Sequence, residues 1–170
     1  MPPEWVDDQR QRVEELIDGY RAALHDSLND LTEEEARRRL VPSNTTLLGL
    51  VRHASFVEGV WFDQAVTGRS YEDIGIPQTV DGSFTLRPTD TIASVQESYR
   101  QRWEASRQNL GGRQSDEIVD GRGERPVWAL YLQVLRELAQ HAGHADILRE
   151  QILASRSASG STVVPSAGDR

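Results

Sequence analysis

The chain has 170 residues, enough for one domain with a hydrophobic core, and a formal net charge of −8 at pH 7. It contains no cysteine, which excludes disulfides, thiolate metal sites and a cysteine nucleophile. The negative charge and the absence of a basic patch in the sequence argue against nucleic acid as a partner.

The chain begins with polar, acidic residues that do not form a signal peptide pattern, and no apolar run approaches the roughly 18 residues of a membrane span. We therefore expect a cytoplasmic protein without a membrane span. Residues 5–28 place apolar side chains at helical spacing and predict a first long amphipathic helix. Thr32 followed by Glu35 is a capping-box signature, which predicts a short helix that ends before Pro42.

A second long helix is predicted over residues 43–68, whose apolar residues form a stripe broad enough for a bundle interior. Ser43, Asn44 or Thr45 can cap its start, and the glycine at its end can terminate it. Residues 69–90 carry glycine and proline among polar residues and predict a long connection rather than a strand pair. Connections of this length are usually functional or wrap around a bundle.

Asp90 or a neighbouring threonine can cap a third helix over residues 91–110, and a fourth helix over residues 127–154 follows a second loop. Four long helices without a credible strand predict an all-α four-helix bundle. The C-terminal residues are rich in serine and glycine and lack periodicity. We therefore expect a bundle domain over residues 1–153 and a disordered tail over residues 154–170.

The fourth predicted helix carries three side chains with metal-binding or acid–base chemistry on one face. At about 100° per residue, His141 lies about 40° to one side of Glu137, and His144 lies about 20° to the other side. Glu137 and His141 can ligate one ion, as can His141 and His144. The alternative is the polar side of an ordinary helix, whose imidazoles bond to carbonyls or face water.

Apolar residues share or border this arc, which favours an interior metal site. Burying a carboxylate and two imidazoles without partners is costly, and a metal ion or a tight hydrogen-bond network is the usual remedy. A catalytic metal needs about three protein ligands, and His53 in the second predicted helix is the candidate for the third. His25, beside Asp26, is expected at the surface. The bordering apolar residues are Leu130, Val134, Leu138 and Ile147.

Two segments, PSNTTLLGLVRHASFVEGVWF at 42–62 and QHAGHADILREQI at 140–152, resemble the DinB-like superfamily, in particular its actinobacterial stand-alone branch. The resemblance covers nearly everything but the tail. It implies an up-and-down four-helix bundle with a long crossover and a divalent metal between helices. In that family one histidine of the second helix and an i, i+4 pair of the fourth bind the metal, which implies His53, Glu137 and His141 as ligands. A glutamate at the first position of the pair follows the mycothiol-dependent maleylpyruvate isomerase pattern.

The resemblance implies a metal-dependent S-transferase in which a low-molecular-weight thiol attacks an electrophilic substrate in detoxification. Mycothiol is the expected thiol, because a composition with arginine and no lysine is typical of a high-GC genome. Zn²⁺ is the expected metal, with Ni, Fe or Mn as alternatives. His144 would be an acid–base group or a fourth ligand. Trp61 and Tyr131, with Trp128 as a third candidate, are expected to line the cofactor pocket. Core packing is the alternative for each of them, and it is the one that we favour for Trp128.

Two other functions stay open on the sequence alone. One is a mycothiol-dependent isomerase, which needs only reversible addition of the thiol. The other is a non-catalytic metal-binding bundle of the stress response. The expected partners are the thiol and its electrophile, and a homodimer through one bundle face is plausible because related bundles often pair.

Overall fold

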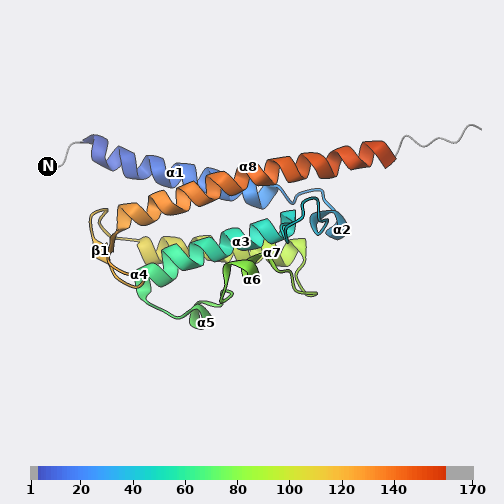
Figure 1. Ribbon diagram of the computed structural model, residues 1–170. Coiled ribbons are helices and arrows are strands. Elements are labelled where there is room, and N and C mark those ends of the chain that lie inside the picture. The colour runs from blue at the N-terminus through green and yellow to red at the C-terminus, as the bar shows by residue number, and fades with distance from the viewer. Residues whose placement is uncertain (1–3, 160–170) are drawn as a thin grey trace, which may run out of the picture.

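The protein is a bundle of four long helical segments that run side by side (Figure 1). The computed structural model describes residues 4–159 and, within them, the side chains of residues 9–156. The expected all-α four-helix bundle is confirmed. Within the described residues, no helix combines the length and hydrophobicity that crossing a membrane requires. The segments are α1 (Glu4–Asp26), α3 (Leu47–Glu58) continued by η1 (Gly59–Gln64) and α4 (Ala65–Thr67), α7 (Ile92–Leu110) and α8 (Val127–Ser159).

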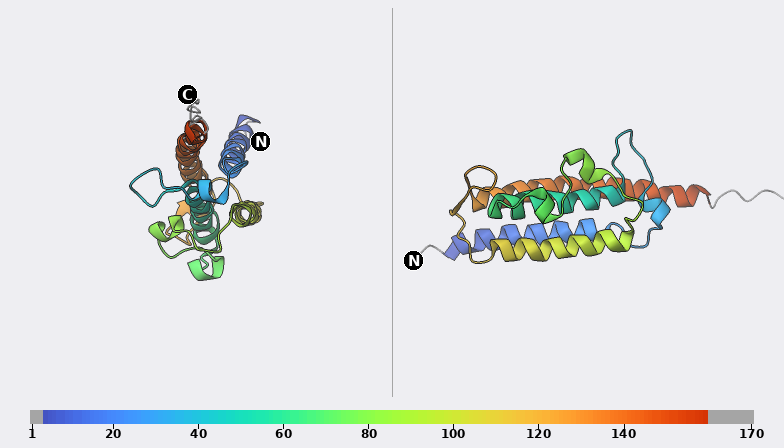
Figure 2. Two further views of the ribbon diagram at one scale, coloured as in Figure 1. Left: turned by 90° about the vertical axis from the view of Figure 1, so that its right-hand side faces the viewer. Right: turned by 90° about the horizontal axis from the view of Figure 1, so that it is seen from below.

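The four segments are arranged so that α1 packs on α8, α8 on α3, and α3 on α7 (Figure 2). Arg52 near the start of α3 approaches Asp90 just before α7, and Arg102 within α7 contacts Asp63 near the end of η1. α3 and α7 therefore run in the same direction, and the up-and-down order holds from α1 to α3 and from α7 to α8. Two parallel neighbours need a connection that returns along the bundle, which explains the long crossover between them.

The crossover contains two short helices, α5 (Tyr71–Ile74) and α6 (Val80–Phe84). The segment TVDGSFTL forms α6 and not a hairpin, because the side chain of Thr79 caps the helix by accepting the N–H of Gly82. α6 packs on α3 and places the fully buried Ser83 against it. The predicted connection is thus confirmed, and it contributes a side chain to the candidate site described below.

The observed cap of α3 lies one to three residues after the predicted ones. Thr46, and not Ser43, Asn44 or Thr45, accepts the N–H of Gly49. The hydroxyl of Ser43 instead donates to the side chain of Thr45 and accepts its backbone N–H. This local turn competes with helix capping, so the helix begins only after it.

Three other predicted helix ends agree with the structure. Thr32 and Glu35 form the expected capping box at the start of α2 (Glu33–Ala36). Thr91, one of the threonines beside Asp90, caps α7. Gly68 ends α4 in the left-handed conformation, with φ of 73°, which is accessible to glycine at little cost.

The second loop contains a short antiparallel ladder, so the expectation of no strand is wrong here. β1 (Ile118–Val119) pairs with β2 (Arg125–Pro126) in the loop before α8. Between them, Gly121 donates its N–H to the carbonyl of Ala65. A Cβ at position 121 would lie 2.2 Å from the carbonyl oxygen of Gln64, so only glycine permits this approach. The contact anchors the loop to the junction of η1 and α4.

Two apolar residues of α8 that the sequence placed in or beside the core are exposed. Ile147 is 57% exposed and Trp128 is 52% exposed, whereas Leu130, Val134 and Leu138 are buried as expected. At about 100° per residue, the middle of the buried face of α8 lies about 70° around the helix axis from Glu137. Trp128 and Ile147 lie more than about 100° from that centre, which is why they face outward.

A buried ion pair crosses the interior of the bundle, and nothing in the sequence pattern indicated it. Glu58 at the end of α3 is 0% exposed and Arg21 of α1 is 5% exposed. The guanidinium donates to both carboxylate oxygens, from Nε at 2.9 Å and from Nη2 at 2.6 Å. Ser106 of α7 donates a third hydrogen bond to this carboxylate at 2.8 Å. The pair therefore connects three of the four long segments.

The expected boundary between bundle and tail at residue 153 lies inside α8, which continues to Ser159. Arg156, near this end, donates through Nε and Nη2 to the carboxylate of Glu35 at 2.6 Å. The predicted tail over residues 154–170 therefore begins later than expected. Residues 160–170 lie outside the described residues, so their disorder stays a prediction.

Replacing Glu35 with glutamine is expected to lower stability at neutral pH but not at low pH. Hydrogen bonds from Arg156 and from the backbone of Thr32 lower the pKa of Glu35 from 4.5 to about 2. A carboxylate with a lowered pKa contributes stability above pH 4.5 and loses it as the pH falls towards 2. Glutamine keeps the acceptor for the Thr32 N–H but loses the ion pair. The urea midpoint of Glu35→Gln should therefore fall below that of the wild type at pH 7.

The difference in midpoint should shrink as the pH falls from about 4.5 to about 2. Glu34→Gln, at an exposed position of the same helical turn, is the matched control and should leave the midpoint nearly unchanged at both pH values. An equal difference at pH 7 and at pH 2.5 would show that the ion pair does not cause the effect.

Candidate metal centre

Three side chains from two helices converge in the bundle interior. His53 extends from α3, and Glu137 and His141 extend from α8, which packs on α3. Each residue offers one ligand atom, and these atoms all lie within 4.8 Å of one another. The rings of His53 and His141 meet edge to face, with centroids 4.7 Å apart. The structure thus brings together the three residues that the sequence predicts as ligands.

The geometry of α8 explains why its three polar residues differ in burial. His141 lies about 30° from the centre of the buried face and is 8% exposed. Glu137, about 70° from that centre, is half-buried, and His144, about 90° from it, is exposed. The ring of His144 lies 5.8 Å from that of His141, on the wall of a surface cavity of about 260 Å³. His144 is therefore at the rim of the site and not among the converging donors.

Ser83 in α6 determines which nitrogen of His53 carries the proton. The hydroxyl of Ser83 donates its single hydrogen to the carbonyl of Val80. It must therefore accept from Nδ1 of His53, which lies 2.6 Å away. This leaves Nε2 of His53 unprotonated and able to act as a metal ligand, the usual role of a hydrogen bond to the other ring nitrogen.

The ring of Phe84 adds a second constraint on His53. It stacks on the imidazole with centroids 4.0 Å apart and planes inclined by 14°. Ser83 and Phe84 thus fix the protonation and the plane of the same ring. The sequence analysis singled out neither residue, because both lie about 30 positions from His53 and have no periodic relation to it.

The ring nitrogens of His141 and one carboxylate oxygen of Glu137 are available to a cation. Both ring nitrogens of His141 are buried, and neither has a hydrogen-bond partner among the described residues. Nε2 approaches Oε2 of Glu137 at 3.5 Å, without hydrogen-bond geometry. The other carboxylate oxygen, Oε1, accepts from Gln133 and Arg136. An imidazole buried without partners is costly, and a cation between it and Oε2 would relieve that cost.

Burial keeps both imidazoles in the neutral form that binds metals. Burial, with a smaller contribution from the charge of His141, lowers the pKa of His53 to about 3. Burial also lowers the pKa of His141, although the carboxylate of Glu137 opposes this shift. Neutral imidazoles offer lone pairs at pH 7, so protons do not compete with a cation for these nitrogens.

The donor set fits a divalent ion such as Zn²⁺. Two imidazole nitrogens and one carboxylate oxygen are ordinary zinc ligands, with bonds of about 2.0–2.2 Å. In a tetrahedral arrangement such ligand atoms lie about 3.4 Å apart. Since the present separations reach 4.8 Å, binding a tetrahedral ion would close the widest of them by about 1.4 Å. Three protein ligands leave a coordination position open, as in catalytic zinc sites.

The structure does not bring Trp61 or Tyr131 to these donors. Tyr131 precedes His141 by ten residues, about 15 Å along α8, and its hydroxyl donates to Glu14 and accepts from Arg10. Trp61 follows His53 by eight residues, about 12 Å along the helix, and two guanidinium groups of the second loop lie over its ring. A cofactor-binding role for either residue stays a prediction.

The expectation that His25 is a surface residue is wrong. Its side chain is 17% exposed, and its ring lies 5.6 Å from that of Trp103 on α7. The packing of α7 against the end of α1 covers it, and this contact cannot be read from the first helix alone. Nδ1 of His25 bonds the carboxylate of Asp26 at 2.8 Å.

Comparisons with known proteins identify a family. A family model described as Mycothiol-S-transferase matches residues 12–154, which include most of α1, all of α3 and α7, most of α8 and the three converging donors. No curated protein matches the chain.

Proposed function

The chain belongs to the mycothiol-S-transferase family, and from this premise we propose that it is a metal-dependent enzyme that transfers mycothiol to an electrophilic substrate. The observation that carries the proposal is the convergence of His53, Glu137 and His141 within 4.8 Å in the interior of a chain from this family. The lack of cysteine is consistent with it, because the thiol would come from the co-substrate. Such a reduced thiol belongs to the cytoplasm, where we place the reaction.

In this proposal His53 Nε2, His141 and Glu137 Oε2 hold the divalent ion, with Zn²⁺ as the expected metal. A bound divalent ion lowers the pKa of a thiol, so that the thiolate nucleophile forms near neutral pH. Ser83 keeps Nε2 of His53 unprotonated, and Arg136 and Gln133 hold Oε1 of Glu137 so that Oε2 faces the site. In this proposal, these contacts orient His53 and Glu137, two of the three donors, before any substrate enters.

His144 is the proposed acid–base residue. It lies one helical turn beyond His141 at the solvent-exposed rim, where it can accept the proton of an entering thiol and release it to water. With a chloroarene as substrate, the sulfur–carbon bond forms, chloride leaves with the electron pair of the carbon–chlorine bond, and the thiol proton goes to His144. General acid–base catalysis by such a group typically raises the reaction rate about 10²–10⁴-fold.

The direct test is transfer of mycothiol to 1-chloro-2,4-dinitrobenzene by the purified protein, with and without metal. We expect turnover that falls at least about 100-fold after chelation and returns when Zn²⁺ is added. Cysteine in place of mycothiol is the control for thiol specificity and should react much more slowly. Thermal denaturation with and without mycothiol measures binding apart from chemistry. A metal-loaded protein that neither turns over nor gains thermal stability with mycothiol would be a non-catalytic metal-binding bundle.

A further inference from the structure

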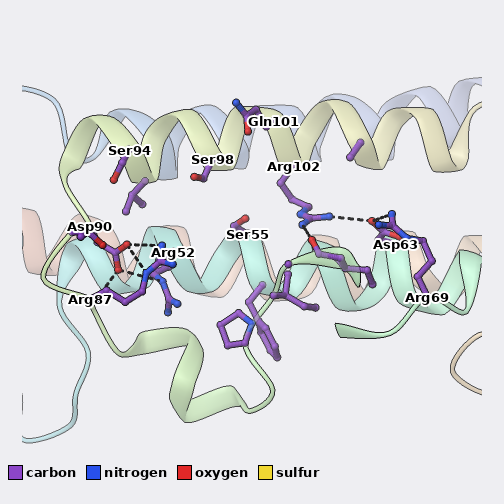
Figure 3. Close-up of a pocket in the computed structure, with 18 residues that line it drawn as sticks. Arg52, Ser55, Asp63, Arg69, Arg87, Asp90, Ser94, Ser98, Gln101 and Arg102 are labelled. Carbon is purple, nitrogen blue, oxygen red and sulfur yellow. Dashed lines mark hydrogen bonds and ion pairs between the residues drawn. The ribbon is translucent and has the colours of Figure 1, made fainter. Parts of the chain in front are cut away.

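A second cavity, of about 540 Å³, lies between α3, α7 and the crossover (Figure 3). The cavity lies along the side of α3 that carries Arg52. The neighbouring His53 points to another side of the helix, where it contacts α6 and α8. Four arginines and two aspartates line it, with hydroxyl and amide groups of α7 on the opposite wall. The charged residues are Arg52, Arg69, Arg87, Arg102, Asp63 and Asp90.

At one end of the cavity, two guanidinium groups share the carboxylate of Asp63. Arg102 of α7 approaches Oδ2 at 3.1 Å, and Arg69 of the crossover approaches the same oxygen at 3.4 Å. Asp63 is 2% exposed, and its single negative charge balances only one of the two guanidinium charges. One positive charge therefore remains at this end.

The other end repeats this arrangement around Asp90, which is 3% exposed. Arg87 donates to Oδ1 from Nε at 3.0 Å and from Nη2 at 2.8 Å, and Nε of Arg52 lies 3.6 Å from Oδ2. Burial alone would raise the pKa of Asp90, but the hydrogen bonds and charge of Arg87 and the charge of Arg52 lower it. The carboxylate is ionised at neutral pH, and again one guanidinium charge is in excess.

The lining thus carries four positive and two negative groups, a formal charge of +2, in a chain whose net charge is −8. Burial lowers the pKa of Arg52; Asp90 opposes this shift, and the nearby charge of Arg87 adds to it. Since the attraction of Asp90 is larger than the repulsion of Arg87, the net lowering of the pKa of Arg52 comes from burial. A cluster of this sign in an acidic protein is the electrostatic complement of an anion.

Arg102 also has a hydrogen-bond donor to spare. Its side chain is 13% exposed; Nη1 donates to Asp63 and Nη2 donates to the carbonyl of Ile74. Its Nε–H is buried and has no acceptor among the described residues. A buried donor of this kind normally has a partner, so Arg102 keeps hydrogen-bonding capacity that the described residues do not use.

We propose that this cavity binds a small ligand with an oxyanion group, a phosphate ester or a carboxylate, at a site separate from the candidate metal centre. Guanidinium groups match the planar or tetrahedral oxygens of such groups with two parallel hydrogen bonds. The volume falls in the range of small-molecule sites, about 300–1,000 Å³. The hydroxyls of Ser55, Ser94 and Ser98 suit polar parts of the same ligand (Figure 3). This inference does not depend on the proposed transferase activity.

The test is calorimetric titration of the full-length protein with inorganic phosphate, glucose 6-phosphate and succinate at constant ionic strength. We expect saturable binding, one ligand per chain, for at least one of these probes. Arg87→Gln and Arg102→Gln should each weaken it at least about 10-fold, since each loses a charged donor. Arg100→Gln is the matched control. Arg100 lies on α7, as Arg102 does, but it pairs with Glu97 and does not line the cavity. Arg87 is 69% exposed, so its variant is expected to fold even if Arg102→Gln does not.

The relative affinities for phosphate ester and dicarboxylate identify the ligand class, and either preference supports the site. Saturable binding of none of the probes would overturn the inference, as would equal weakening in Arg100→Gln. Equal binding of uncharged glucose would show that the oxyanion is not recognised. Binding that disappears on chelation, or that mycothiol displaces, would assign the anion to the metal centre and contradict a separate site. Each of these results is independent of whether the protein transfers mycothiol.

Discussion

Replacing His53 with alanine is expected to abolish metal binding and to reduce thiol transfer at least about 100-fold. The same result is expected for His141→Ala, because each substitution leaves two donors where a divalent ion needs about three from the protein. Metal content of the purified variants, by elemental analysis, should fall from about one equivalent per chain to near zero. Thermal denaturation in excess chelator would separate this loss from a loss of folding.

Two further variants distinguish ligation from other roles. His144→Gln should keep the metal but lower the turnover number, because His144 lies at the rim and not among the converging donors. Ser83→Ala should weaken metal affinity about 10–100-fold while leaving all three ligands in place, since it removes the hydrogen bond that fixes the tautomer of His53. His25→Ala is the control, because it removes a half-buried histidine that is not among the converging donors. Full metal content in His53→Ala would show that the ion binds at other residues.

The part of this site that could be predicted from the sequence is the part that lies within one helix. The positions of Glu137, His141 and His144 around α8 follow from the fixed angle per residue, and so does their common face. The angle alone did not reveal where the buried face of α8 ends. That limit depends on the packing of α1 and α3, and it separates the buried His141 from the exposed His144.

The groups that act on these donors from other elements could not be predicted in this way. Ser83 reaches His53 from the crossover, and its position depends on the cap of a five-residue helix within a segment that reads as a loop. The arginines of the second cavity come from α3, the crossover and α7, and each is an ordinary charged residue in its own segment. Only the parallel course of α3 and α7 brings them to the same cavity.

The same distinction holds for the fold. Helical periodicity and capping residues located the four long segments, and the Thr32 capping box was predicted at its observed position. The parallel course of α3 and α7 has no signal in either helix, because the hydrophobic stripe of a helix is the same in both directions. The β1–β2 ladder is only two residues long on each side, too short for a period-2 pattern to be visible.

The buried pair of Arg21 and Glu58 leads to the largest expected effect on stability. Glu58→Ala should lower the free energy of unfolding by about 3–5 kcal/mol, because it leaves the guanidinium of Arg21 buried with only part of its hydrogen bonding through Asp18. For a chain of this size that corresponds to a fall in melting temperature of roughly 6–20 °C. Arg12→Ala, which removes an exposed pair with Glu15, should cost less than about 1 kcal/mol.

The double variant Arg21→Met, Glu58→Leu tests why the single substitution is costly. If most of the cost is an unpaired buried charge, then removing both charges and filling the space with apolar side chains should restore at least about 2 kcal/mol relative to Glu58→Ala. If the double variant is no more stable than the single one, the hydrogen bond from Ser106 and the packing around Glu58 carry the stability instead. Glu58 ends α3 five residues after His53, so the two outcomes also predict different effects on the metal centre. A pair that only balances charge can be replaced without loss of metal, whereas a pair that positions α3 cannot.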